Sequence, residues 1–188
     1  EFAVPKDILK NQDSYEKISK LSKQTNANLV LGSLVNTKEI HPDGRVSIWD
    51  SAFVFSRNGT LHGRYDSIMP FPFENDFISG DNLPIFEIDA GRFGITICYE
   101  GLYNTIYKQY SKSDVHFFIS IANNEPVHDP HAMHTSSLFT RLRAAENRKY
   151  LIRATNTGIT QVVNPYGKVI AKLKPNKEGI LLTEIYLR

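Results

Sequence analysis

Gly94-Ile95-Thr96-Ile97-Cys98-Tyr99-Glu100 is an apolar run that delivers the single cysteine of this 188-residue chain. The run has the composition of a buried strand, so Cys98 is expected where that strand ends. A thiol at such a place is a candidate nucleophile, because thiolates are reactive and a strand end holds them rigidly. A lone cysteine is also often an inert core residue, since unpaired cysteines are among the most buried side chains. Both interpretations stand on this segment alone.

The regions on either side of this segment carry the patterns of further strands and helices. Apolar runs predict strands over 28–35, 47–56, 61–65, 83–88, 115–122, 150–155, 160–164 and 169–173. Helical spacing of apolar residues predicts helices over 6–27, 102–110 and 136–148. Continuous apolar strands that alternate with amphipathic helices indicate an α/β sandwich.

Composition narrows the class of protein. With 41% hydrophobic and 22% charged residues, the chain is expected to form a single domain over 1–188. The net charge is only +2, and basic residues are interspersed with acidic ones, so a nucleic-acid partner is not expected. A single cysteine excludes an internal disulfide. No apolar run approaches the roughly 20 residues that span a bilayer.

Several segments together resemble the nitrilase, or carbon–nitrogen hydrolase, superfamily. Glu1-Phe2-Ala3-Val4-Pro5 resembles its Pro-Glu-x-Ala-[Ile/Val]-Pro element, and Cys98-Tyr99-Glu100 resembles its nucleophile motif. Arg141-Leu142-Arg143-Ala144-Ala145-Glu146 and Arg153-Ala154-Thr155-Asn156-Thr157-Gly158 are similar to one branch, the periplasmic domain of the apolipoprotein N-acyltransferases. The resemblance covers nearly the whole chain.

The resemblance implies a fold and a set of site residues. The fold would be an α-β-β-α sandwich whose first strand is missing here, so that the chain would be a fragment of a longer protein. A Glu–Lys–Cys triad is implied, with Glu1 as general base and Cys98 as nucleophile. Glu74 would match the glutamate of the family's Pro-Phe-Gly-Glu loop. Tyr99 and Glu100 would flank the nucleophile, where a backbone N–H would contribute to an oxyanion hole.

The chain departs from the family's pattern at two places. The family has Tyr-x-Lys-x-x-Leu-Val-Pro-Phe, and aligning it without gaps to the segment that begins at Tyr65 puts Ser67 at the position of the catalytic lysine. Losing one oxyanion-hole donor costs about 3–4 kcal/mol, so a weak catalyst is expected unless another cation reaches the site. Arg64 is the nearest cation, but strand alternation points it away from the face of Ser67. Pro126-Val127 also stands where the acyltransferases usually have Trp-Phe.

Three functions remain open at this stage. The first is transfer of an acyl chain from a phospholipid, through a thioester on Cys98, to the free amine of a diacylglyceryl lipoprotein. It would occur at the periplasmic face of a bacterial inner membrane, with membrane association through missing parts of the parent chain. The second is a soluble, cytoplasmic amidase, and the third is an inactive binding or assembly module that lacks the lysine. No cofactor is expected for any of them, and the oligomeric state stays open.

A histidine-rich segment lies between the strand predicted over 115–122 and the helix predicted over 136–148. His128, His131 and His134 are spaced by three residues, and on a helix the third would lie about 240° round from the first. Pro130 is expected to prevent a regular helix there. The segment is therefore predicted to be a solvated loop, and no metal site is expected.

Overall fold

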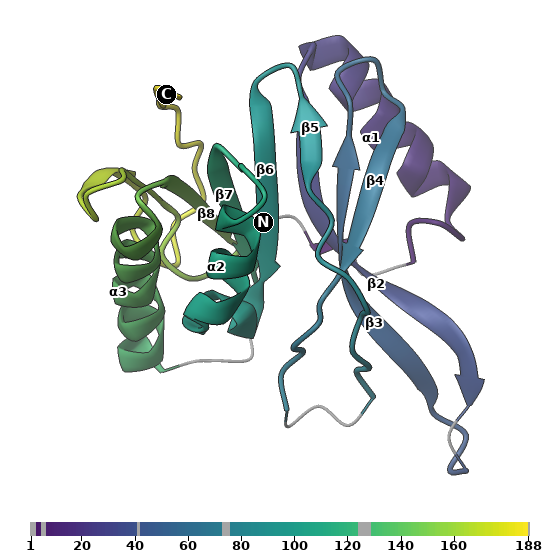
Figure 1. Ribbon diagram of the computed structural model, residues 1–188. Coiled ribbons are helices and arrows are strands. Elements are labelled where there is room, and N and C mark those ends of the chain that lie inside the picture. The colour runs from purple at the N-terminus through teal and green to yellow at the C-terminus, as the bar shows by residue number, and fades with distance from the viewer. Residues whose placement is uncertain (1–2, 5–6, 41, 73–75, 124–128, 188) are drawn as a thin grey trace. The chain divides into compact units, whose positions relative to one another are not determined.

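The computed structural model describes residues 3–4, 7–40, 42–72, 76–123 and 129–187 (Figure 1). The chain divides into two compact units, which we call the N-terminal unit, Phe2–Pro84, and the C-terminal unit, from Ile85 to Arg188. In the described residues each unit has its own sheet, with helix α1 in the N-terminal unit and helices α2 and α3 in the C-terminal unit.

The N-terminal unit has a four-stranded sheet of order β1-β2-β3-β4 and one helix. Its elements are β1 (Ala3–Val4), α1 (Gln12–Thr25), β2 (Leu29–Ile40), β3 (Val46–Phe55) and β4 (Leu61–Asp66). Strand β1 runs parallel to β2, and the other neighbours pair antiparallel through short turns. Helix α1 begins after Asn11, whose side chain accepts a hydrogen bond from the Ser14 N–H at 2.9 Å and so caps the first turn.

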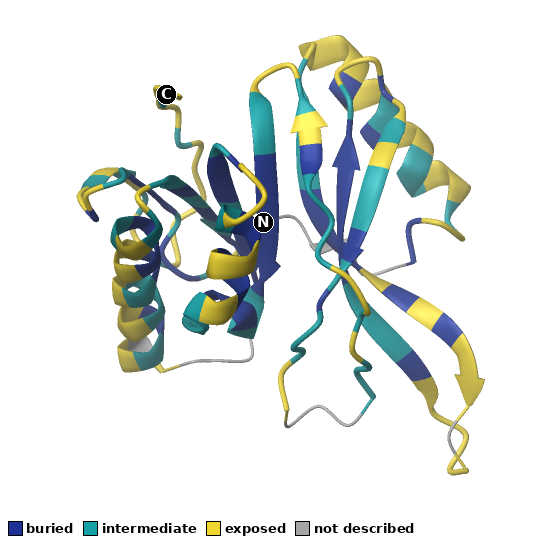
Figure 2. Ribbon diagram, in the orientation of Figure 1, coloured by how far each residue is buried: buried dark blue, intermediate teal, exposed yellow. Residues whose placement is uncertain are grey.

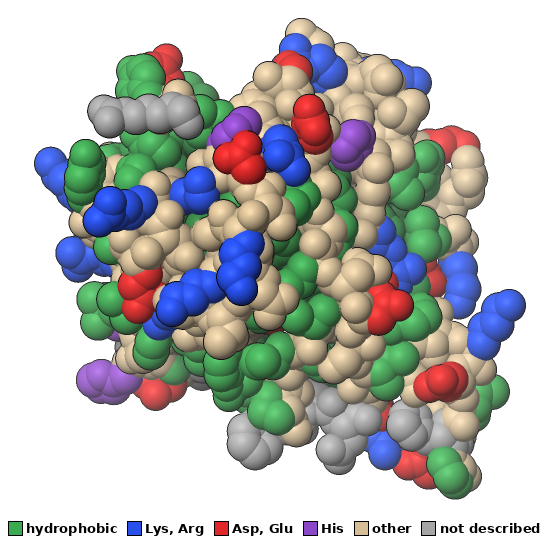
Figure 3. All heavy atoms as spheres, in the orientation of Figure 1, with side chains coloured by type: hydrophobic (Ala, Val, Ile, Leu, Met, Phe, Trp, Pro, Cys, Tyr) green, Lys and Arg blue, Asp and Glu red, His purple; other side chains and the backbone are tan. Residues whose placement is uncertain are grey.

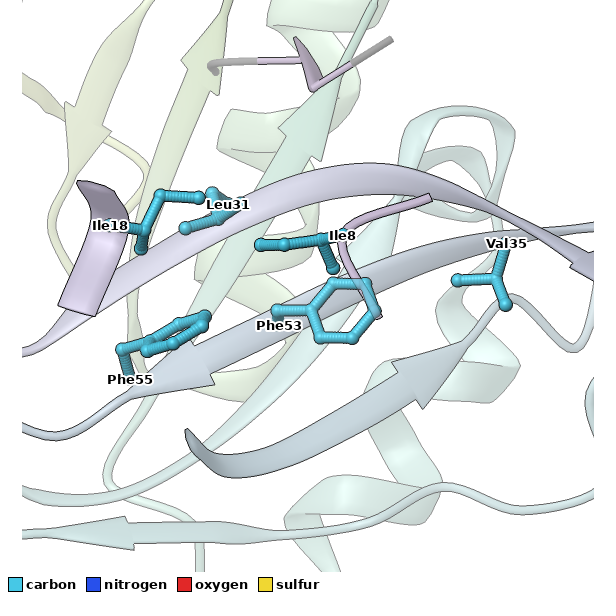
Figure 4. Packing of buried hydrophobic residues seen from close by; sticks show 6 residues of the cluster. All are labelled: Ile8, Ile18, Leu31, Val35, Phe53 and Phe55. Atoms are coloured by element: carbon cyan, nitrogen blue, oxygen red, sulfur yellow. The ribbon is translucent and has the colours of Figure 1, made fainter. Parts of the chain in front are cut away.

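The core of the N-terminal unit is apolar. Six buried side chains from the segment before α1, from α1, from β2 and from β3 form it (Figure 4): Ile8, Ile18, Leu31, Val35, Phe53 and Phe55. Tyr15 packs against Phe55 edge to face, with ring centroids 5.3 Å apart. Each fully buried side chain of this size contributes about 1.5–3 kcal/mol relative to an exposed one.

The C-terminal unit has a six-stranded sheet of order β10-β9-β8-β7-β6-β5. Its elements are β5 (Phe86–Ile88), β6 (Gly91–Ile97), a 3₁₀ turn (Cys98–Leu102), α2 (Asn104–Ser111), β7 (Phe117–Ala122), α3 (Pro130–Asn147), β8 (Tyr150–Thr155), β9 (Gln161–Val163) and β10 (Val169–Lys172). The central strands β6, β7 and β8 are parallel, because the segments that carry α2 and α3 return the chain to the start of the next strand. Figure 2 shows β6 largely buried, whereas exposed and buried positions alternate along α3.

These elements confirm the predicted α/β class. Most predicted strands and helices are present within a few residues of their expected bounds. Helix α1 begins later than expected, because the preceding residues form a turn in which the Lys10 N–H donates to the Asp7 carbonyl at 3.0 Å. The strands predicted over 47–56, 61–65 and 150–155 agree with the observed bounds to within one residue, whereas β2 extends five residues beyond the strand predicted over 28–35.

The predicted loop around the histidines was wrong. Helix α3 begins at Pro130, where a proline fits because the first helical residues need no backbone donor. The Asp129 side chain caps this end by accepting from the His131 N–H at 2.8 Å. His131 and His134 are exposed on the helix, and His128 lies outside the described residues. Within the described ranges, no three His, Cys, Asp or Glu side chains are grouped so that they could hold a metal ion.

Two further features are the hydropathy of the helices and the distribution of charge on the surface. No helix in the part of the chain that the structure describes is long and apolar enough to cross a membrane. On the face drawn in Figure 3, Lys and Arg side chains lie among Asp and Glu side chains. This mixture matches the near-neutral net charge of the sequence.

Candidate functional site

Cys98 directly follows β6 and begins the 3₁₀ turn, as the sequence predicted. Ile97 pairs with Ile121 of β7, and Ala122 pairs with Thr155 of β8, so the three parallel strands end at one edge. In α/β proteins ligands bind at the carboxyl ends of parallel strands. The half-buried thiol of Cys98 therefore lies at the edge of this sheet where a site is expected.

The backbone of Cys98 is held in an unusual conformation. Its φ is 49°, in the left-handed region that residues with a side chain rarely adopt. This conformation costs about 1–2 kcal/mol and persists only where the surroundings impose it. Nucleophiles in other hydrolases lie at comparable strained turns that follow a strand. The strain therefore supports the interpretation of Cys98 as a nucleophile over that of an inert core cysteine.

Glu100 ties the turn back to the end of the strand. Its side chain is fully buried, at 0% exposed, and its Oε2 accepts a hydrogen bond from the Ile97 N–H at 2.8 Å. A carboxylate without solvent is stable only with hydrogen bonds and compensating charge around it. Glu100 thus fixes the backbone on both sides of Cys98.

Tyr99 and Tyr103 form a pair beside the nucleophile. The Tyr103 hydroxyl donates to the Tyr99 hydroxyl at 2.7 Å, and the two rings meet edge to face with centroids 5.2 Å apart. This hydrogen bond is the main cause that raises the pKa of Tyr103. Both side chains are half-buried, so they can offer a substrate an apolar ring and a hydroxyl. Sequence reasoning missed Tyr103, although its spacing of four from Tyr99 was a signal.

A row of polar side chains crosses the sheet near the carboxyl ends of the parallel strands β6, β7 and β8. Thr96 of β6 pairs in register with Ser120 of β7, and Ser120 pairs with Arg153 of β8. The row continues to Gln161 of β9, whose Nε2 donates to the Ser137 carbonyl of α3 at 2.9 Å. The four residues of this row are all buried. We call it the polar row.

Tyr107 of α2 closes the polar row on the helical side. Its hydroxyl lies 2.9 Å from Thr96 Oγ1, and Ser120 Oγ lies close to it without the geometry of a hydrogen bond. Burial raises the pKa of Tyr107, the neighbouring Arg153 charge lowers it, and the Glu100 charge raises it. Ionisable groups with perturbed pKa values cluster at functional sites more often than elsewhere.

Two carboxamides lie at the ends of β7 and β8. The side-chain amide of Asn156 donates to the side-chain oxygen of Asn123. Asn123 directly follows β7 and Asn156 directly follows β8, so this pair shares the edge of the sheet at which Cys98 lies. It adds neutral hydrogen-bonding groups to the candidate site.

The other predicted site residues are not gathered at this edge by the described structure. Glu1 and Glu74 lie outside the described residues. Ser67 belongs to the N-terminal unit, where it is buried after β4, and its N–H donates to the Asp50 carbonyl at 2.8 Å. The pairing of Ser67 with Cys98 in one site stays a prediction of the resemblance.

Arg64, the cation considered as a substitute for the missing lysine, has partners within the N-terminal unit. Its Nε forms an ion pair with Asp66 Oδ1 at 2.6 Å, and its guanidinium lies 4.9 Å from the ring centroid of Trp49. These contacts hold it in place on its own sheet.

Comparison with known proteins places the chain in a family. The chain belongs to the carbon–nitrogen hydrolase family, whose model matches residues 3–188. The apolipoprotein N-acyltransferase of Geobacter metallireducens is 29% identical over 175 residues, which cover 82% of this chain and 34% of that protein. A probable nitrilase of Schizosaccharomyces pombe is 26% identical over 191 residues, which cover 96% of this chain and 67% of that protein.

Solved structures match as well. A mutant amidase from Nesterenkonia sp. AN1, with acrylamide added at its active-site cysteine, superposes with a TM-score of 0.78 and 14% identity. The match covers 96% of this chain and 71% of that one. These comparisons confirm the predicted superfamily and the nitrilase-like fold. The chain spans 34% of the length of the Geobacter enzyme.

Proposed function

We propose that this chain is the thiol-bearing part of an acyltransferase that moves an acyl group from a phospholipid to the N-terminal amine of a lipoprotein. The observation that carries the proposal is Cys98 at φ 49° on the carboxyl edge of the parallel strands, held by the buried Glu100. The likeness to apolipoprotein N-acyltransferases supports the choice of donor and acceptor.

In the first half-reaction the sulfur of Cys98 attacks the ester carbonyl of the phospholipid. The carbonyl carbon forms a bond to Sγ and loses its bond to the glycerol oxygen, so a lysophospholipid leaves and takes up the proton that the thiol gave. The resemblance to the family implies that Glu1 is the general base that takes this proton from the thiol and passes it on. The acyl group is then a thioester on Cys98.

In the second half-reaction the free amine of the lipoprotein attacks the thioester. A carbon–nitrogen bond forms, the carbon–sulfur bond breaks, and a proton from the amine returns to the sulfur. Both steps pass through a tetrahedral oxyanion. We assign its stabilisation to hydrogen bonds from the backbone N–H groups of the turn at Tyr99 and Glu100. One such donor contributes about a hundred- to thousandfold in rate.

Ser67 is the weak point of this proposal. A serine supplies no positive charge, so we expect turnover to be slow and Ser67→Lys to raise it by about a hundredfold or more. In the longer parent chain that we propose, the remaining segments would attach the enzyme to the periplasmic face of a bacterial inner membrane.

A second candidate is an amidase that passes the acyl group to water. The probable nitrilase and the Nesterenkonia amidase, which match this chain over 96% of its length, favour it. A third candidate, a binding or assembly module without catalysis, is motivated by Ser67 alone.

The decisive experiment is intact-mass spectrometry of the protein after incubation with phospholipid vesicles and, separately, with an activated ester. Cys98 is the single cysteine, so a thiol-bound acyl group has one address. We expect an acyl adduct that Cys98→Ala abolishes and Ser67→Lys accelerates. An adduct in no variant, with either donor, would overturn the proposal and favour the binding module.

The acceptor is tested next with the acylated protein. A diacylglyceryl lipopeptide with a free amine should discharge the thioester and gain the acyl mass. Discharge at the same rate in buffer alone, together with ammonia release from small amides that depends on Cys98, would favour the amidase instead.

A further inference from the structure

Arg153 is a buried cation next to the turn that carries the nucleophile. It lies in the middle of β8 and is only 4% exposed. A methyl group placed on the α-carbon of Gly101 would lie 3.7 Å from Arg153 Nη1 and 3.6 Å from Ser120 Oγ. Gly101 belongs to the 3₁₀ turn that Cys98 begins, so the guanidinium of Arg153 faces this turn from the interior of the sheet.

The same turn contains a buried charge of opposite sign. The Glu100 side chain is 0% exposed, and it holds the Ile97 N–H. The charges of Glu100 and Arg153 both act on the hydroxyl of Tyr107, and in opposite directions. The two charges therefore share one neighbourhood, in which each reduces the cost of burying the other.

The polar row links this charge to the strand that ends at Cys98. Thr96, Ser120 and Arg153 are partners in register across β6, β7 and β8. Thr96 precedes Cys98 by two residues, and its hydroxyl lies 2.9 Å from that of Tyr107. Two register pairings thus connect Arg153 to Thr96, the residue two positions before Cys98.

We propose that Arg153 is a positioning residue for Cys98: it compensates the buried carboxylate of Glu100, which in turn keeps the turn closed on the Ile97 N–H and Cys98 in its left-handed conformation. The inference rests on the proposed function, in which Cys98 is the nucleophile. A neutral residue at 153 would remove this compensating charge from the neighbourhood of the buried Glu100 carboxylate. The carboxyl would then take up a proton or move towards solvent, and the turn would open.

Two measurements test this proposal. Because the chain has one cysteine, protein labelled with carbon-13 cysteine gives one pair of Cα and Cβ resonances, which reports the backbone conformation of Cys98 without any substrate. The rate of acylation by an activated ester reports its chemistry. The variants are Arg153→Met, Arg153→Lys, Glu100→Gln and the double variant Arg153→Met with Glu100→Gln.

We expect Arg153→Met to shift or broaden the Cys98 resonances and to slow acylation by about tenfold or more, because coupled buried groups interact strongly. Arg153→Lys should keep the resonances in place, since it keeps the charge. The double variant should return the resonances to their positions in Glu100→Gln alone. Arg92→Met is the matched control, because Arg92 lies at the other end of β6, 3.8 Å from Asp114.

The outcomes separate the two proposals. If the starting protein is never acylated, the proposed function fails, and the resonances still test the role of Arg153. If Arg153→Met and the double variant disturb the resonances equally, the charge of Glu100 is not involved and the inference is wrong. If Arg153→Met does not fold, the double variant is expected to fold, and its failure would equally overturn the inference.

Discussion

In the N-terminal unit the cluster buried between α1 and the sheet consists of apolar side chains, whereas in the C-terminal unit two charged side chains, Glu100 and Arg153, are buried near the Cys98 turn together with apolar ones. Apolar burial stabilises a fold by about 25 cal/mol per Å². A buried hydrogen bond or ion pair adds little net stability and costs much when one partner is lost. The apolar cluster of the N-terminal unit therefore stabilises the fold. The buried charges of the C-terminal unit add little net stability, and we infer that their role is to hold the conformation of Cys98.

The largest effect on stability is expected in the apolar interior. Phe53 is 0% exposed within the cluster of Figure 4, and Phe53→Ala removes its contacts and leaves a cavity. We expect the free energy of unfolding to fall by about 3–5 kcal/mol, measured by urea denaturation. Leu21→Ala on the exposed side of α1 is the control and should cost far less, because Leu21 is 50% exposed. Similar losses at both positions would contradict the account of this core.

The buried phenol of Tyr110 in the C-terminal unit should make the free energy of unfolding fall at alkaline pH. Burial raises the pKa of Tyr110, and the Glu100 charge raises it further, while its hydroxyl donates to the Ile95 carbonyl at 2.9 Å. In the unfolded chain the phenol ionises near pH 10, so its contribution to stability is complete below that pH and is lost as the pH rises towards the folded value. Each such group lowers stability by about 1.4 kcal/mol per pH unit in this window.

Urea denaturation at a series of values from about pH 8 to about pH 12 measures this slope. Tyr110→Phe should reduce the slope of the free energy of unfolding against pH by the contribution of one proton, about 1.4 kcal/mol per pH unit. Tyr166→Phe, at a residue that is 83% exposed, should leave it unchanged. An unchanged slope in Tyr110→Phe would mean that the folded protein tolerates the phenolate, and the contrast between the two interiors would be smaller than we infer.

Much of the fold follows from apolar periodicity. The segment that becomes β7 is a near-continuous apolar run, and such runs predict strands buried on both faces. The sequence pattern does not predict the start of α3, because a proline inside a segment usually indicates that no regular helix continues there. A proline is compatible with the first turn of a helix, and Asp129 before it was a capping signal.

The candidate site was only half predictable. Cys98 and Glu100 lie together in the sequence, so the motif contains both. Thr96, Ser120 and Arg153 come from three strands and meet only through the register of a parallel sheet. One sequence does not contain that register. A polar residue inside each apolar run was the available signal, because such a residue is buried and must find a partner.

Relieving the backbone strain at Cys98 should raise the free energy of unfolding, whereas the substitution Phe53→Ala lowers it, and the effect should be smaller. At φ 49° an alanine keeps the unfavourable contact between its Cβ and the backbone, and a glycine removes it. We expect Cys98→Gly to unfold with about 1 kcal/mol more free energy than Cys98→Ala. The same comparison in β8, with Ala154→Gly, should instead destabilise by about 0.5–1 kcal/mol, because a regular strand disfavours glycine. A loss at both positions would show that the turn does not strain Cys98.

The smallest effects on stability are expected at two N-terminal helix caps, one in each unit. Asn11 caps α1 through the Ser14 N–H at 2.9 Å, and Asp129 caps α3 through the His131 N–H at 2.8 Å. Alanine at either position should cost about 1 kcal/mol in urea denaturation. Asp129→Asn keeps the acceptor and removes the charge, so it should cost only the helix-dipole share, about 0.3–1 kcal/mol. Equal costs would mean that both units obey the same backbone rules and differ only in what they bury; a much larger cost at Asp129 would tie the start of α3 to the site as well.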